Sequence, residues 1–88
     1  MDADVIRAHI DRKAAELRQR YPDMTHCDSA LSQRREEGKL RYSLYLELRW
    51  PQTQVLVTGP VHGDAGTAID AAFQEARARI DQSTWASR

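Results

Sequence analysis

The sequence of 88 residues carries thirteen Lys and Arg residues, thirteen Asp and Glu residues, and a single cysteine, Cys27. A formal net charge of zero excludes a general attraction of the whole protein to polyanions, so nucleic-acid binding would need a local basic face. One cysteine cannot form an internal disulfide, and no run of about 18 apolar residues is present to cross a membrane. These features predict one cytoplasmic domain, residues 1–88, with a modest core.

Residues 4–21 are predicted to form an amphipathic helix. Apolar side chains recur at steps of three and four residues and form one stripe: Ile6, Ile10, Ala14, Leu17 and Tyr21. Asp2 or Asp4 can cap the start of this helix, where a carboxylate also complements the helix dipole. Pro22 is expected to end it, because the residue before a proline is disfavoured in helical conformation.

Residues 24–34 are predicted to form a weak strand, with Cys27, Ser29 and Leu31 on one face and the turn "REEGK" after it. The clearest pattern follows in residues 40–50, where polar and apolar side chains alternate strictly. The apolar face of this strand consists of Leu40, Tyr42, Leu44, Leu46, Leu48 and Trp50. After a short turn at Pro51 and Gln52, "TQVLVTG" at residues 53–59 is predicted as a further strand.

Residues 64–82 are predicted to form the last helix. Its buried stripe is expected to consist of Ala65, Ile69, Ala72, Phe73, Ala76 and Ile80. We interpret "HGD" at residues 62–64 as the entry to this helix, with Asp64 as its N-cap, rather than as a reactive site. The short connections predict an α+β two-layer sandwich: a helix, a three-stranded antiparallel meander and a helix, with both helices on the leucine face of the sheet.

The sequence offers no recognisable catalytic set. Its three histidines, His9, His26 and His62, lie on a helix, a strand and a loop, without a repeated metal-ligand spacing. Neighbours in a strand point to opposite faces, so His26 and Cys27 cannot share a metal ion. No serine or cysteine has a nucleophile context, and the glycines lack the lysine of a phosphate loop. We therefore expect no enzymatic activity, no cofactor, no metal and no small-molecule substrate.

Basic side chains are the candidate functional groups. On the first helix, Lys13 and Arg20 lie on one flank of the apolar stripe, and Arg7 and Arg18 lie on the other. The first hairpin adds Arg34, Arg35, Lys39 and Arg41, diluted by two glutamates. Glutamates stand four residues before Arg20 and Arg79, a spacing typical of paired charges on a solvated surface. Charge pattern alone therefore leaves RNA binding and an ordinary surface both open.

Tyr45 raises a separate question on the strand of residues 40–50. It is predicted to share the face opposite the leucines with Arg41 and Arg49. An aromatic ring flanked by arginines can stack on a nucleic-acid base, but the same ring can also pack against neighbouring strands. The sequence leaves both interpretations open.

Three segments of the chain carry a family resemblance. "DRKAAEL" at residues 11–17 is similar to a first-helix pattern, and "GKLRYSLYLELRWPQTQVLVT" at residues 38–58 is similar to a long strand, tight turn and following strand. "HGDAGTAIDAAFQEARARI" at residues 62–80 resembles a helix motif of the form "HEDVYxAIxDAFDAARRQL". Together these segments resemble the ribosome hibernation-promoting factor family, also called ribosome-associated inhibitors or sigma-54 modulation proteins.

The resemblance implies a domain that docks on the small ribosomal subunit, occupies the channel of messenger and transfer RNA, and silences idle ribosomes. Arg12, Lys13 and Arg77 fall on basic positions of the family, which implies contacts to rRNA phosphates. We place Lys13 and Arg77 first, because neither has an obvious favourable acidic partner in its own helix. Arg18, Arg20 and Arg79 come second, from charge pattern alone, and Ala78 stands where the family has an arginine.

The family normally has a strand before its first helix, whereas this sequence begins with the helix. In the family that strand pairs with the segment corresponding to residues 24–34. We therefore expect this segment to form an open sheet edge and to support a homodimer. The alternative function is accordingly a protein-interaction domain of the same fold that does not bind ribosomes and self-associates through this edge.

Overall fold

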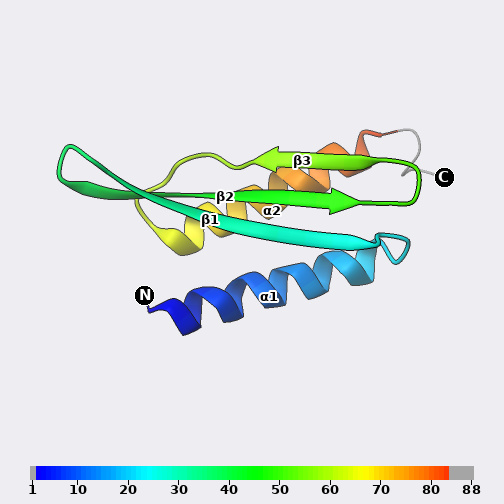
Figure 1. Ribbon diagram of the computed structural model, residues 1–88, viewed down its shortest axis with the longest axis horizontal. Coiled ribbons are helices and arrows are strands. Elements are labelled where there is room, and N and C mark those ends of the chain that lie inside the picture. The colour runs from blue at the N-terminus through cyan, green and yellow to red at the C-terminus, as the bar shows by residue number, and fades with distance from the viewer. Residues whose placement is uncertain (1, 84–88) are drawn as a thin grey trace.

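The computed structural model describes residues 2–83. Its elements are α1 (Ala3–Arg20), β1 (His26–Glu36), β2 (Lys39–Arg49), β3 (Gln54–Thr58) and α2 (Ala65–Asp81). The strands form one antiparallel sheet in the order β1-β2-β3, with α2 behind the sheet and α1 alongside β1 (Figure 1). The predicted α+β arrangement of helix, three-stranded meander and helix is confirmed.

Both helices begin at an aspartate that lies just outside the first turn. The Val5 amide donates to the Asp2 carboxylate over 3.0 Å, so Asp2 rather than Asp4 caps α1. The Asp64 carboxylate accepts from both the amide and the hydroxyl of Thr67, at 2.8 and 2.9 Å. The prediction that Asp64 is the N-cap of the last helix is thus confirmed, and "HGD" is a helix entry.

The core lies between the leucine face of β2 and the apolar stripe of α2. Leu44, Leu46 and Leu48 are completely buried, as expected for alternate positions of a strand with one covered face. The predicted stripe of α2 is buried along its whole length: Ala65, Ile69, Ala72, Phe73, Ala76 and Ile80. The alternating apolar residues of β2 and the helical apolar stripe of α2 therefore pack against one another in a single core layer.

A close approach between α2 and the end of β3 depends on Gly59. A Cβ atom at this position would lie 2.7 Å from the Cβ of Ala72 and 3.1 Å from the carbonyl oxygen of Leu44. Atoms do not approach this closely without displacement, so the absence of a side chain lets α2 sit directly on the sheet. This contact sets the height of the second helix above β2.

The β1–β2 hairpin differs from the prediction in its ends and in its tip. The first strand runs over residues 26–36 rather than 24–34, and only Glu37 and Gly38 form the turn. Both turn residues have positive φ, 52° and 78°, as a two-residue type I′ turn requires. Leu40, expected to be buried, is 37% exposed. The hairpin extends past both helices at its tip, so no helix covers this leucine (Figure 1).

Helix α1 is buried along only part of its predicted stripe. Leu17 is 2% exposed, whereas Ile6, Ile10 and Ala14 are half-buried at the margin of the core. In Figure 1, α1 is near β1 at its C-terminal end and diverges from it toward its N-terminal end. The helix therefore packs chiefly against α2 and meets the sheet only at the edge strand.

Candidate nucleic-acid interface

Helices α1 and α2 lie side by side and leave a groove of about 520 Å³ between them, which we call the interhelical groove. It is lined by Lys13, Glu16, Leu17, Arg20, Asp70, Phe73, Gln74 and Arg77. Three of the predicted basic residues, Lys13, Arg20 and Arg77, thus come together from two helices that are distant in sequence. Leu17 and Phe73 are core residues and form the apolar base of the groove.

Lys13 is held by two carboxylates. Its Nζ atom lies 3.8 Å from Glu16 Oε2 in the same helix and 3.9 Å from Asp70 Oδ1 on α2. The expectation that Lys13 has no acidic partner in its own helix is therefore wrong: three residues also bring side chains together on a helix surface. The Lys13 side chain is 31% exposed, so it remains reachable from the groove, but part of its charge is compensated.

Arg20 does not pair with Glu16 as its spacing suggested. The Arg20 Nη2 atom lies 3.3 Å from Asp81 Oδ2, and Arg20 Nε donates to the Tyr21 hydroxyl over 3.0 Å. The same hydroxyl donates to Asp81, which closes a small network between the C-terminal ends of α1 and α2. The bond from Tyr21, followed by the nearby charges of Arg20 and Arg77, lowers the pKa of Asp81. Arg20 thus serves to join the helices as much as to line the groove.

Arg77 is the uncompensated cation of the groove. Its side chain is exposed on α2, and within residues 2–83 no carboxylate lies within 4.0 Å of it. It is close enough to Asp81 to contribute to the lowered pKa of that carboxyl group, but no hydrogen bond joins the two. The guanidinium of Arg77 is therefore available to an anion that enters from solvent.

Beside Lys13, a second polar network links the two helices. His9 Nε2 lies 2.7 Å from Asp70 Oδ1, and Arg12 Nη2 lies 2.7 Å from His9 Nδ1. A guanidinium can only donate, so Nδ1 accepts and the ring proton of neutral His9 is on Nε2, directed at Asp70. Arg12, predicted to contact phosphate, is thus engaged with His9. Asp70 was missed by sequence analysis, since its role depends on the packing of α1 on α2.

Arg18 and Arg79 lie outside the interhelical groove. Arg18 is exposed and is near Cys27, where burial raises the pKa of the thiol and Arg18 offsets this only in part. Arg79 Nη1 donates to the Leu56 carbonyl of β3 over 2.7 Å. Its Nη2 is also 3.8 Å from Glu75, so the predicted pair four residues apart is confirmed. These contacts tie Arg79 to the sheet.

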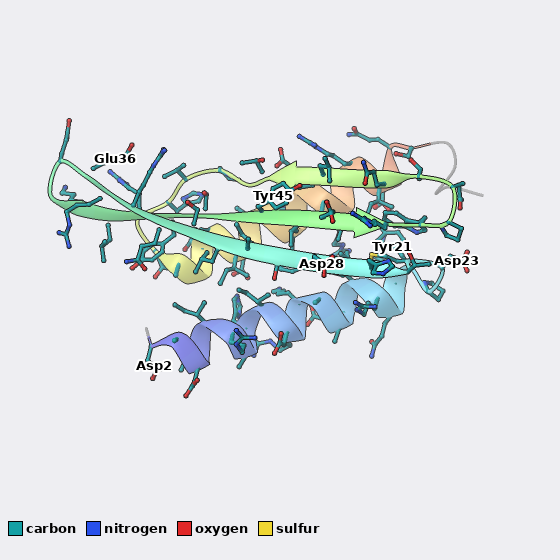
Figure 2. The ribbon with its side chains drawn as sticks, viewed as in Figure 1. Asp2, Tyr21, Asp23, Asp28, Glu36 and Tyr45 are labelled. Carbon is teal, nitrogen blue, oxygen red and sulfur yellow. The ribbon has the colours of Figure 1, made fainter. Side chains whose placement is uncertain are left out.

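The predicted basic residues of the hairpin also lie away from the groove. Arg34 is 3.4 Å from Glu36, and Arg35 donates to the Gly38 carbonyl over 3.3 Å. Figure 2 shows Glu36 near the hairpin tip, at the opposite end of the molecule from Tyr21. Arg34, Arg35 and Lys39 therefore form a second basic area and are not part of the surface formed by the helices.

Within residues 2–83, the structure contains no group of three or more His, Cys, Asp or Glu side chains arranged to hold a metal ion. Neither of the two described helices combines the length and apolar character needed to cross a bilayer. Comparison of the chain with protein-family models, curated proteins and solved structures finds no match in any of the three.

Proposed function

We propose that the protein is a cytoplasmic, ribosome-associated translation inhibitor that docks on the small ribosomal subunit through contacts to rRNA phosphates. The observation that carries this proposal is the interhelical groove, where Arg77 has no ion pair with any residue from 2 to 83 and lines the same groove as Lys13 and Arg20. Phosphate contacts of this kind give affinity and orientation without reading base sequence. The resemblance of both helices and of β2 to the hibernation-factor family names the ribosome as the target.

The number of charged side chains in the groove determines how strongly its affinity for RNA should depend on salt concentration. Three basic side chains line it together with two carboxylates, those of Glu16 and Asp70. We therefore expect one to three phosphate contacts, each contributing about −0.7 to −0.9 to the slope of log affinity against log salt concentration. Arg77 is expected to make the strongest contact, because binding a phosphate requires it to break no ion pair within the described part of the chain.

The test is co-sedimentation of the protein with purified small subunits over a series of salt concentrations. Arg77→Gln should weaken binding and reduce the salt slope by about 1. Arg7→Gln is the matched control, since it removes the same charge from the exposed surface of α1 outside the groove. The double change Lys13→Glu and Arg77→Glu should abolish binding while circular dichroism shows an intact fold.

Two outcomes would contradict the proposal at different levels. If the wild-type protein does not pellet with small subunits at low salt, ribosome docking is wrong. If the double variant still pellets as the wild type does, the interhelical groove is the wrong site. A parallel loss in the Arg7→Gln control would mean that overall charge, rather than the groove, determines binding.

The open edge of β1 supports a second candidate, a self-associating interaction domain. Along the middle strand, backbone hydrogen bonds alternate between the two neighbouring strands. The amide of Gly59 donates to the carbonyl of Leu44, so the backbone groups of even-numbered β2 residues pair toward β3 and those of odd-numbered residues pair with β1. The odd-numbered β2 residues are opposite even-numbered β1 residues, so the even-numbered residues of β1 pair with β2. The backbone N–H and C=O groups of the odd-numbered β1 residues therefore point away from the sheet: Cys27, Ser29, Leu31, Gln33 and Arg35. These groups are free to accept another strand.

The sequence of β1 is complementary to itself. If two copies pair antiparallel about Leu31, Asp28 of one copy lies opposite Arg34 of the other, and His26 lies opposite Glu36. This candidate ranks second because α1 runs alongside the same edge and narrows the approach of a second sheet (Figure 1).

Sedimentation equilibrium of wild type and Ser29→Pro tests the self-association. Proline removes an outward amide without breaking the bonds between β1 and β2, so the variant should be monomeric and folded. A wild-type protein that stays monomeric at high concentration would exclude this candidate.

A further inference from the structure

The face of the sheet opposite the helices is uncovered in the part of the chain that the structure describes. α2 lies behind the sheet in Figure 1, and the side chains that alternate with the buried leucines point to the other side. Toward the hairpin, this face has a surface that we call the outer platform. It consists of Ala30, Ser32 and Arg34 of β1 and Arg41, Ser43 and Tyr45 of β2.

Tyr45 lies on the middle strand, β2 (Figure 2). Its directly opposed neighbours are Ala30 on β1 and Thr58 on β3, and its side chain is 37% exposed. Among residues 2–83 it has no aromatic neighbour in ring contact and its hydroxyl forms no hydrogen bond. Neighbouring side chains thus cover most of Tyr45, and the exposed third of its surface is the part open to a ligand from solvent.

At the other end of the platform, two arginines occupy opposed positions on β1 and β2, and the Arg41 guanidinium extends toward Gly63. Arg34 and Arg41 are directly opposed in the β1–β2 register, an arrangement of like charges that disfavours the sheet. Arg34 is partly compensated by Glu36 at 3.4 Å, but Arg41 has no carboxylate within 4.0 Å in the described chain. Ser32 and Ser43, which are opposed to one another, lie between the arginines and Tyr45. Arg41 and Tyr45 are four residues apart, which is roughly 13 Å along β2.

We propose that the outer platform binds single-stranded nucleic acid, with a base stacked on Tyr45 and the adjoining phosphates against Arg41 and Arg34. Every base has an aromatic face, and stacking on an exposed ring is a common way to hold an unpaired strand without reading its sequence. Arginine provides two parallel donors to a phosphate, and the intervening serine hydroxyls can donate to phosphate or sugar oxygens.

The chemistry of this face favours a nucleic acid over a protein partner. Leu56 is the other large apolar side chain exposed on it within residues 2–83. The rest are small, polar or charged, and the charged ones include the carboxylates of Asp28, Glu36 and Glu47 as well as the arginines. A stable protein interface needs a larger buried apolar centre than these two side chains provide. The charge of Arg41, which has no carboxylate within 4.0 Å among residues 2–83, is in contrast complementary to a phosphate backbone.

This site is independent of ribosome docking, because it lies on the opposite side of the sheet from the interhelical groove. Its test needs no ribosomes: fluorescence anisotropy of labelled oligouridine and oligodeoxythymidine, titrated with the full chain at several salt concentrations. Tyr45→Thr should weaken binding about tenfold, whereas Tyr45→Phe should bind as wild type does, since only the ring is required. Arg41→Gln should weaken binding and reduce the salt slope by about 0.7.

Arg7→Gln is the matched control, because it removes an arginine from the exposed surface of α1, outside both the platform and the interhelical groove, and should leave oligonucleotide affinity unchanged. Comparison of the RNA and DNA strands shows whether the sugar hydroxyl contributes. The proposal is overturned if wild type does not bind either strand at low salt, or if Tyr45→Thr binds as tightly as wild type. It is also overturned if sedimentation equilibrium shows a dimer that Tyr45→Thr dissociates, since the face would then bind a second copy.

Discussion

Asp70 opposes the proposed role of the interhelical groove, which makes its removal a sharp test. Its carboxylate accepts from His9 and lies 3.9 Å from Lys13, so it places a negative charge where a phosphate would enter. Asp70→Asn keeps the size of the side chain and an oxygen that can still accept from His9. We expect this variant to bind small ribosomal subunits more tightly than wild type does.

The structure sets the size of this effect. Opposite charges about 4 Å apart attract by ~1 kcal/mol in water and ~4 kcal/mol at an effective dielectric constant near 20. Because the Asp70 side chain is 55% exposed, the lower value applies, and exposed pairs typically contribute about 0.2–1 kcal/mol to folding. A similar change in repulsion from an incoming phosphate corresponds to a roughly three- to fivefold gain in affinity at low salt. Release of Lys13 should steepen the salt slope by up to about 0.9.

The assay is co-sedimentation with small subunits at several salt concentrations, together with urea denaturation to measure the free energy of unfolding. Glu36→Gln is the control, because it removes an equal charge at the hairpin, away from the groove. The gain for Asp70→Asn should exceed that for the control and diminish as salt rises. Equal gains in both variants, or no gain in either, would refute the assignment of the groove as the phosphate site.

Other predictions concern the fold. Gly59→Ala should lower the free energy of unfolding by about 1–3 kcal/mol, because the new Cβ would meet Ala72; unchanged urea denaturation would contradict the close packing. Glu37→Asn, at the hairpin turn, should raise the free energy of unfolding by about 1 kcal/mol or less, because asparagine tolerates the positive φ of this position better than glutamate does. Thermal melts would show this as a higher melting temperature. Hydrogen bonds in the folded state lower the pKa of Asp64 and Asp81 from 3.8. Their contribution, present above this pH, should be lost as pH falls through the folded pKa values, so melting temperatures should drop there and less steeply in Asp64→Asn.

Prediction from sequence succeeded where neighbours along the chain decide the outcome. The alternation of β2 puts Leu44, Leu46 and Leu48 on one face of any strand, and helix α2 covers that face. Asp64 caps α2 through an amide three residues away, which again needs only local geometry. Elements, caps and the apolar face of the second helix were therefore readable before any packing was known.

The candidate site was less predictable, because its contacts join distant parts of the chain. Helical spacing identified the Glu75–Arg79 pair, but it could not show that Arg79 also reaches a carbonyl of β3. The same reasoning assigned Glu16 to Arg20, whereas Arg20 is held by Asp81 from the other helix. Spacing within one helix cannot reveal competition from a neighbouring helix.

The sequence by itself determined the local structure of this protein: which residues form helices and strands, and which face of β2 is apolar. Only the tertiary structure decided how much of each apolar face is covered and which charges remain uncompensated. Leu40 is exposed because the hairpin extends past the helices, and Lys13 shares a carboxylate with His9 because α1 packs against α2. Burial and ion pairing depend on where whole elements lie relative to one another, and that position is set by the packing of many side chains together.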